Sequence, residues 1–216
     1  MNKTTNSYDV KKLVGMAMFA ALAYGVTFVF RIPVMFLTFD AKDTIITIAS
    51  LMYGPISGVV ISLIAALIEF ITISGTGVYG FIMNFASSAA FSATAALIYK
   101  YKKNPTGAVI SLYAASITMV TVMLCLNILV TPYYMKQPTA AVIALLPKII
   151  LPFNIAKALL NSALVMLLYK PVTVAMRRAK LLRGEGKMSV NRSSLVVYIT
   201  ALVTLIAAIT LFVILK

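Results

Sequence analysis

The chain has 216 residues, of which 62% are hydrophobic, and it carries a formal net charge of +14. A soluble domain is about 45–50% apolar, so this composition predicts an integral membrane protein without a separate soluble domain. The absence of histidine excludes histidine metal sites and catalytic triads, and no Walker A phosphate-binding motif occurs. We therefore expect no enzyme, no metal and no cofactor. The basic residues lie in short loops between apolar runs, which is typical of membrane orientation and not of nucleic-acid binding.

Seven apolar runs predict seven helices, and most of them approach the ~20 residues that span a bilayer. In chain order they cover residues 13–30, 44–53, 56–73, 81–99, 107–131, 148–169 and 195–215. Gly54-Pro55 separates the short second run from the third. A single helix over 44–73 would be about 45 Å long against a hydrocarbon core of about 30 Å, and Pro55 has no backbone donor to continue it.

These runs predict an all-α polytopic membrane helix bundle, with a six-helix core and a seventh, C-terminal helix. The expected organisation is a membrane bundle over 1–172, a basic cytoplasmic connector over 173–194 and an extra transmembrane helix over 195–216. The seventh run contains no Asp, Glu, Lys or Arg residue. We expect its helix to run outward from the basic connector, to pack on the periphery and to contribute nothing to the substrate pocket.

The distribution of basic residues sets the orientation, because cytoplasmic loops carry an excess of Lys and Arg. With residues 1–12 and the Gly54-Pro55 turn in the cytoplasm, 13 of the 19 basic residues lie inside. Lys42 then falls in an outer loop. Three loops face outside, at 31–43, 75–80 and 132–147, and their content of Phe, Tyr and Pro favours a lid over an apolar ring. The alternative is an aromatic belt at the membrane interface.

Five polar or ionisable side chains lie inside four apolar runs, near the end of each run that is assigned to the outside: Glu69, Asn84, Asn127, Asn154 and Lys157. Such side chains are costly in hydrocarbon, so they usually face one another or a cavity. Their shared depth predicts a pocket that opens outward and captures a polar small molecule. The alternatives are interhelical hydrogen bonds for the asparagines and outward snorkelling for the lysine.

Three of the polar residues have the spacing of one helix face, namely Asn154, Lys157 and Asn161. Their donors and acceptors suit a ligand that is rich in hydroxyl and carbonyl groups. Glu69 either pairs with Lys157 or has no partner, and an unpaired carboxyl group at that depth would be neutral.

Two further features stand near the first outer loop. Asp40 and Asp43 lie where this loop enters the second helix, and Asp43 either caps that helix or contacts ligand or anchors the lid. On the first helix, Ala17, Ala21 and Gly25 recur every four residues, and small residues at this spacing let another helix approach closely. That face is expected to meet either another helix of the chain or another membrane subunit.

Several segments together resemble a known family. LTFDAKD (37–43) leads into YGPISG (53–58), and LNI (126–128), PY (132–133) and ILPFNIAK (150–157) follow. In this order and spacing they are similar to the riboflavin-specific substrate-binding (S) components of energy-coupling-factor (ECF) vitamin transporters. The resemblance covers about residues 10–172. Its most specific parts are the Pro-Phe-Asn-x-x-Lys stretch and the Asp-x-x-Asp entry to the second helix.

The resemblance implies a six-helix protein of the bacterial plasma membrane that binds its vitamin from outside. It also implies docking on a transmembrane T subunit that works with two cytoplasmic ATPases. By matching positions, Asn127, Asn154 and Lys157 would hold the vitamin, and Ala17 and Ala21 would meet the T subunit. The outer stretch Leu37, Thr38, Phe39 and Asp40 would lie over the ligand. The outer aromatic residues Phe36, Phe39, Tyr79, Phe85 and Tyr133 would stack on an isoalloxazine ring.

The sequence departs from the family pattern at two places in the expected pocket. Ala65-Ala66 stands where the family often has Lys-Asn, and Ile128 stands where a Tyr often follows the Asn of the fifth helix. An S component for another vitamin, such as a pyrimidine, pantothenate or a queuosine precursor, therefore stays an alternative. A stand-alone secondary transporter is a second alternative, although Glu69 would be its single deep carboxylate.

Overall fold

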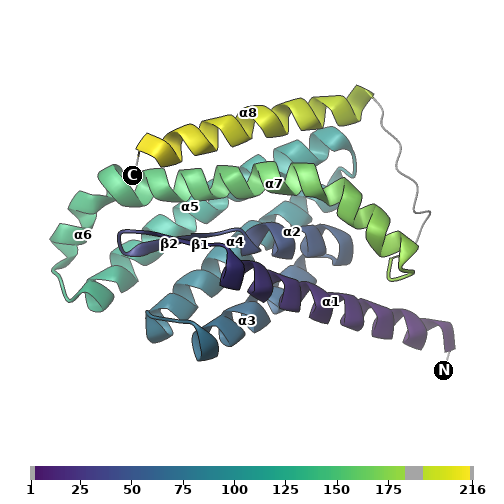
Figure 1. Ribbon diagram of the computed structural model, residues 1–216, viewed down its shortest axis with the longest axis horizontal. Coiled ribbons are helices and arrows are strands. Elements are labelled where there is room, and N and C mark those ends of the chain that lie inside the picture. Colours follow the sequence, from purple (N-terminus) through teal and green to yellow (C-terminus); the bar gives the residue numbers. More distant parts are fainter. Residues whose placement is uncertain (1–2, 183–191, 215–216) are drawn as a thin grey trace.

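The computed structural model describes residues 3–182 and 192–214 and forms a helix bundle (Figure 1). Its elements in chain order are α1 (Lys3–Val29), β1 (Arg31–Val34), β2 (Leu37–Asp40), α2 (Lys42–Tyr53), α3 (Pro55–Thr72), α4 (Gly77–Tyr101), α5 (Pro105–Met135), α6 (Thr139–Leu145), the π-helical turn η1 (Leu146–Ile150), α7 (Leu151–Arg178) and α8 (Arg192–Ile214). The predicted all-α membrane bundle is confirmed. A short two-stranded hairpin, β1–β2, was not predicted.

The second and third helices are separate, as predicted. α2 has 12 residues and ends at Gly54, whose φ of 101° lies in a region that glycine enters at little cost. Pro55 then occupies the first position of α3, where its missing N–H would have no partner in any case. This turn reverses the chain in two residues. α2 therefore stops partway through the bundle, and at about 1.5 Å per residue it is only about 18 Å long.

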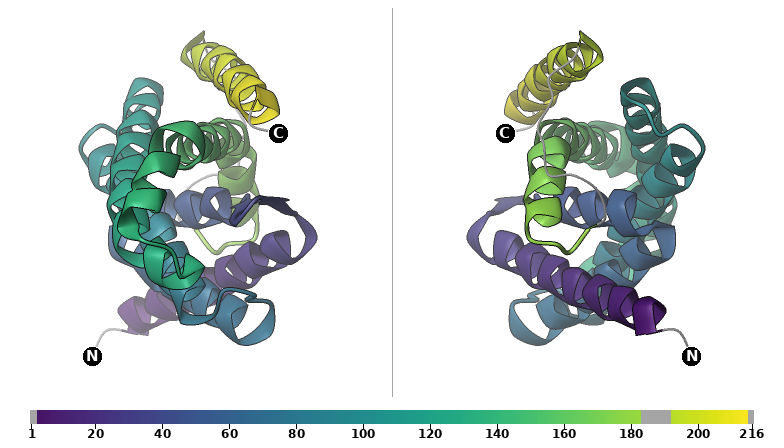
Figure 2. Two further views of the ribbon diagram at one scale, coloured as in Figure 1. Left: turned by 90° about the vertical axis from the view of Figure 1, so that its left-hand side faces the viewer. Right: turned by 90° about the vertical axis from the view of Figure 1, so that its right-hand side faces the viewer.

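Short α2 lies at the centre of the molecule, where α1, α3, α4 and α7 all contact it (Figures 1 and 2). Its residues Ile46, Ile48 and Ala49 are completely buried. Phe19 of α1 and Phe91 of α4 pack into the same core. Because neighbours cover it on every side, α2 can carry both apolar and polar side chains without exposing either to lipid.

Six helical segments in the described residues are long and apolar enough to cross a membrane, and α2 is not one of them. They are Asp9–Val29, Pro55–Thr72, Gly77–Tyr101, Pro105–Met135, Thr139–Arg178 and Leu195–Ile214. The chain is therefore a multi-pass membrane protein. α7 continues to Arg178 without a break, so position 172, the expected end of the membrane bundle, lies inside this helix.

The last helix, α8, lies along α7 and runs in the opposite direction (Figure 1). Its contact face consists of small residues, with Ala201, Thr204 and Ala208 buried. The hydroxyl groups of Thr204 and Tyr113 of α5 lie 2.6 Å apart. Most of the large apolar side chains of α8 are exposed. This arrangement agrees with the expected peripheral position. The prediction that Lys216 lies on the outer side of the membrane concerns a residue outside the described ranges.

The segment between α1 and α2 forms the antiparallel hairpin, with Arg31 opposite Asp40 and Val34 opposite Leu37. Its two-residue connection begins at Met35, whose φ is 53°. Pairing gives backbone N–H and C=O groups of each strand hydrogen-bond partners in the other. At its base, Arg31 donates a hydrogen bond of 2.7 Å to the Ile73 carbonyl, at the end of α3. The hairpin is thus fastened to the bundle rather than extended into solvent.

Candidate ligand-binding site

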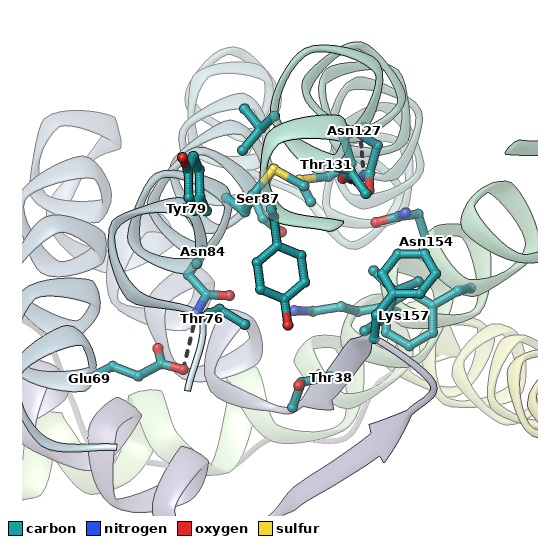
Figure 3. Close-up of a pocket in the computed structure, with 18 of the residues that line it drawn as sticks. Thr38, Glu69, Thr76, Tyr79, Asn84, Ser87, Asn127, Thr131, Asn154 and Lys157 are labelled. Carbon is teal, nitrogen blue, oxygen red and sulfur yellow. Dashed lines mark hydrogen bonds between the residues drawn. The ribbon is translucent and has the colours of Figure 1, made fainter. Parts of the chain in front are cut away.

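A cavity of about 100 Å³ lies beneath the hairpin, between the end of α3, the start of α4, the end of α5 and the start of α7 (Figure 3). The residues that line it are Arg31, Phe36, Leu37, Thr38, Glu69, Thr76, Tyr79, Gly80, Met83, Asn84, Ser87, Met123, Asn127, Val130, Thr131, Tyr134, Phe153, Asn154 and Lys157. Hydrogen-bonding groups and aromatic rings thus share one enclosed space. Such a combination is typical of a small-molecule site, in which a few polar groups orient a mostly apolar ligand.

Nine of the residues expected at the site line this cavity. They are Phe36, Leu37, Thr38, Glu69, Tyr79, Asn84, Asn127, Asn154 and Lys157. Figure 3 shows the asparagines approaching from three different helices, with Lys157 between Asn154 and the hairpin. The shared depth of polar residues along separate apolar runs therefore located the cavity.

Five other expected residues lie elsewhere. Phe85 does not line the cavity and stacks instead on Phe81, with ring centroids 6.4 Å apart. Tyr133 is 72% exposed on the outside of α5, facing away from the bundle interior. Phe39 is buried behind the hairpin, where its ring packs edge-on against Phe212 of α8 at 5.9 Å. The fourth and fifth, Asp40 and Asn161, are engaged in polar contacts inside the bundle.

Asn161 holds the start of α2 rather than a ligand. Its side-chain oxygen accepts hydrogen bonds from the backbone N–H of Thr44, at 3.1 Å, and from the Thr44 hydroxyl, at 2.7 Å. Its amide nitrogen donates to the Lys157 carbonyl at 3.0 Å. The first N–H groups of a helix have no partner within the helix, so Asn161 satisfies one of them from α7. Lys157 thus lines the cavity, whereas Asn161, one turn further along α7, contacts the start of α2.

The two cavity asparagines on α5 and α7 are held by their own helices. Asn154 donates to the Ile150 carbonyl at 2.8 Å, and Asn127 donates to the Met123 carbonyl at 2.7 Å. Asn127 also accepts a hydrogen bond of 2.9 Å from Thr131. Both side chains are almost completely buried. These bonds fix the direction of each amide group before any ligand arrives, which limits the entropy that binding costs.

Lys157 reaches the hairpin through an ion pair. Its ammonium nitrogen lies 3.1 Å from Oδ2 of Asp40 in β2 and 3.6 Å from Oδ2 of Asp43 in α2. Burial alone raises the pKa of the Asp40 carboxyl group, but Lys157 and Lys42 together outweigh it, so the pKa lies below its usual value. Asp40 is therefore ionised at neutral pH. The alternative of outward snorkelling for Lys157 is not observed, because its ammonium group pairs with the Asp40 carboxylate of the hairpin.

Glu69 pairs with Lys42 and not with Lys157. The Lys42 ammonium nitrogen lies 2.6 Å from Oε2 of Glu69 and 3.7 Å from Oδ2 of Asp40, and Asn84 donates to Oε1 of Glu69 at 3.1 Å. Lys42 was assigned to the loop over 31–43, but it is the first residue of α2 and is 1% exposed. It forms the first turn of α2, where the hairpin folds it back into the bundle.

Asp43 does not cap α2 through its side chain. Its carboxylate accepts a hydrogen bond from Ser88 of α4 and faces Lys157. The hairpin, α2, α3 and α7 therefore share one buried charge network of two lysines and three carboxylates. This network contains three of the five acidic residues of the chain, namely Asp40, Asp43 and Glu69. Removing one member would leave another buried charge without compensation.

The small-residue face of α1 points away from the bundle. Ala17 and Ala21 are exposed, whereas Phe19 and Ala23 on the opposite face are buried. A side-chain carbon added at Gly25 would meet no atom within 4 Å. Contact with another helix of the same chain is thus not what Ala17 and Ala21 provide. The free face stays available to a partner in the membrane.

Sequence reasoning missed the role of Lys42 and several cavity residues, such as Arg31, Tyr134 and Phe153. One signal was available for the hairpin. Two four-residue runs, RIPV and LTFD, flank two residues, which is the spacing of a tight hairpin. Recognising it would have placed Arg31 opposite Asp40 and brought both ends of the loop to the cavity.

Comparison with known proteins gives consistent matches. The family described as "ECF transporter, substrate-specific component" matches residues 11–169. The riboflavin transporter RibU of Staphylococcus aureus (strain TCH60) is 32% identical over 182 residues, covering 80% of this chain and 96% of the relative. The riboflavin transporter FmnP of Bacillus subtilis (strain 168) is 28% identical over 173 residues, covering 74% and 90%. A solved structure of the S component of a bacterial ECF transporter superposes with a TM-score of 0.67 at 29% identity, covering 79% of this chain and 99% of that one.

Proposed function

Because this chain belongs to the substrate-specific components of ECF transporters, we propose that it captures riboflavin, or a close flavin analogue, as the membrane subunit of such an importer. The observation that carries the proposal is the cavity beneath the hairpin, where the polar and aromatic groups that a flavin needs converge. The relatives from Staphylococcus aureus and Bacillus subtilis are riboflavin transporters, which supports the same ligand.

The chemistry of the lining supports a flavin. Tyr79, Tyr134 and Phe153 offer faces on which a flat ring system stacks. Asn84, Asn127 and Asn154 offer amide groups to ring carbonyls or to the hydroxyls of a ribityl chain, as do Thr38 and Lys157. An apolar ring and a polyhydroxy chain would thus each find matching partners within one cavity.

The cavity must enlarge to receive such a ligand. Its volume of about 100 Å³ is below the ~300–1,000 Å³ of pockets that enclose drug-sized ligands. The hairpin supplies Leu37 and Thr38 to the lining and its connection supplies Phe36, so a displacement of the hairpin would widen the cavity without displacing a helix. We propose that it opens on capture and closes over the vitamin, with the Asp40–Lys157 ion pair as its fastening.

The orientation and the partners belong to the same proposal. The excess of basic residues favours a cytoplasmic N-terminus, which puts the hairpin and its cavity on the outside of the bacterial cell membrane. The exposed face of Ala17, Ala21 and Gly25 on α1 would dock on the transmembrane T subunit, and two cytoplasmic ATPase subunits would drive release inward. Small residues allow the close helix approach that such docking needs.

Flavin binding by the isolated chain tests this proposal. Riboflavin fluorescence should be quenched when the detergent-purified protein is added, with saturation at one flavin per chain and without ATP or partner subunits. Pantothenate and a pyrimidine vitamin serve as competitors that should not restore the fluorescence. Absence of quenching at micromolar flavin, together with clear binding of one of the other vitamins, would identify a different substrate for the same transporter type.

A further inference from the structure

A second, larger cavity lies at the opposite end of the bundle. Its volume is about 350 Å³, and it is enclosed by the end of α4, the start of α5, the C-terminal half of α7 and the start of α8. The first cavity lies at the other end of α4 and α5, so the two sites share no lining residue. α8 contributes one wall, through Val197 and Tyr198, and this helix lies outside residues 11–169 that match the family.

The lining of the second cavity is strongly positive. Three basic side chains border it, Lys103 from the α4–α5 turn and Lys170 and Arg177 from α7, whereas no acidic residue does so among the described residues. An Arg guanidinium binds phosphate oxygens in a fork, and a Lys ammonium adds a mobile point charge. The three charges come from two separate elements and converge on one space, as in a site for a single anionic group.

Neutral donors accompany these charges. The hydroxyl groups of Tyr99, Tyr169 and Tyr198 belong to three different helices that border the cavity. α5 also begins here, with Asn104 accepting a hydrogen bond of 2.6 Å from the N–H of Gly107. The N-terminus of a long helix carries a partial positive charge that favours an anion. Tyrosines and a helix start thus reinforce the basic residues.

The remaining walls are apolar, with Met166 and Val174 of α7 and Val197 of α8. α7 and α8 both belong to candidate membrane spans, and the cavity is lined by residues near the end of the first span (Val174, Arg177) and near the start of the second (Val197, Tyr198). The ends of a membrane-spanning helix are where the headgroups of a bilayer lie. A free phosphate ion would gain nothing from the apolar walls. A phospholipid would use both parts, since its phosphate meets the charges and its glycerol and first methylenes meet the side chains of α7 and α8.

We infer that this second cavity is a binding site for the phosphate-bearing headgroup of an anionic phospholipid, held by Lys103, Lys170 and Arg177 between α7 and α8. Basic pockets between transmembrane helices are known to hold such headgroups. The bound lipid would link α8 to the rest of the bundle at the end opposite the hairpin. The site is independent of the vitamin cavity and of whichever vitamin that cavity accepts.

Native mass spectrometry of the delipidated, detergent-purified chain tests the site. Phosphatidylglycerol should bind at one tight site, and phosphatidylcholine with the same acyl chains should bind more weakly. The variant Lys170→Gln with Arg177→Gln should lose roughly 25-fold in phosphatidylglycerol affinity, at about 5-fold for each charge removed. The matched control, Lys136→Gln with Lys148→Gln, removes two exposed charges elsewhere on the chain and should bind like the wild type.

Three results would overturn the inference. They are equal phosphatidylglycerol affinity in the double variant and the wild type, an equal loss in the control variant, and full displacement of the lipid by millimolar inorganic phosphate. The last would assign the site to the free ion. If the double variant does not fold, Lys103→Gln replaces it. Lys103 is exposed in a turn, so this change should spare folding and still weaken phosphatidylglycerol binding about 5-fold.

Discussion

Lys42 and Glu69 form a buried ion pair in which the ammonium nitrogen lies 2.6 Å from a carboxylate oxygen, although the two residues are 27 positions apart in the chain. Their side chains are only 2% and 6% exposed. The pair joins the first turn of α2 to the last turns of α3, and Asp40 and Asn84 extend it to the hairpin and to α4. The ends of these four elements are thereby held at fixed positions around the cavity beneath the hairpin.

Replacing Lys42 by Met should destabilise the protein by about 3–5 kcal/mol, because Glu69 would be left as an uncompensated buried charge. Chemical unfolding in detergent, followed by circular dichroism, measures the change. The double variant Lys42→Met with Glu69→Gln should recover part of the loss, since no buried charge is then left alone at this position. Lys148→Met is the control, because Lys148 is exposed. A single variant as stable as the wild type would show that the pair contributes nothing to stability.

Asn154→Ala should weaken riboflavin binding about 5- to 150-fold, because a ligand group in the closed cavity loses a hydrogen-bond partner worth roughly 1–3 kcal/mol. Fluorescence titration gives the change in affinity. The unfolding temperature should change little, since Asn154 makes a single bond to its own helix in the unliganded protein.

Asn161→Ala is the matched control for that variant, because it is the same change seven residues further along α7. It removes the bonds to Thr44 at the start of α2, so it should lower the unfolding temperature. Measured well below that temperature, its riboflavin affinity should stay within a few-fold of the wild type. If Asn161→Ala weakens binding more than Asn154→Ala does, the ligand lies deeper along α7 than the cavity indicates.

Ala17→Leu with Ala21→Leu should prevent association with the T subunit and leave riboflavin binding by the isolated chain unchanged. The two leucines would stand between α1 and a closely packed partner helix. Co-purification of the T subunit and vitamin uptake by cells measure docking. Thr121→Leu adds bulk to an exposed position of α5 and is the control. Loss of flavin binding in the double variant would assign the α1 face to packing within the chain.

A cysteine added after Lys216 should be labelled by an impermeant maleimide in intact cells, because α8 is expected to run outward from a basic cytoplasmic connector. Cys125 is exposed on α5, so it must first be replaced by alanine. A cysteine added before Met1 should react only after permeabilisation. The opposite pattern at the C-terminus would mean that α8 does not cross the membrane.

The sequence predicted the helices and the cavity because both depend on local patterns. Runs of apolar residues specify the spans, and the depth of Asn84, Asn127 and Asn154 within their runs specifies the cavity. The ion-pair and hydrogen-bond partners of the buried polar side chains could not be predicted in this way. Whether Lys42 is solvated or buried depends on the hairpin folding back over α2, and whether Asn161 faces a ligand or a helix start depends on where α2 ends against α7. These are long-range contacts that helical spacing alone does not specify.

The short length and the charged first turn of α2 affect the order in which the chain folds. α2 is too short to cross the bilayer by itself, and its first turn carries Lys42 and Asp43. The partners of that turn arrive at different times during synthesis: Glu69 soon after, but Asn161 117 residues after the Thr44 that it binds. We therefore expect the contacts around the first turn of α2 to be completed only after the ribosome has synthesised α7. The cavity beneath the hairpin would then be among the last parts of the protein to form. α7 supplies residues that line this cavity, and it also supplies the Asn161 that holds the start of α2.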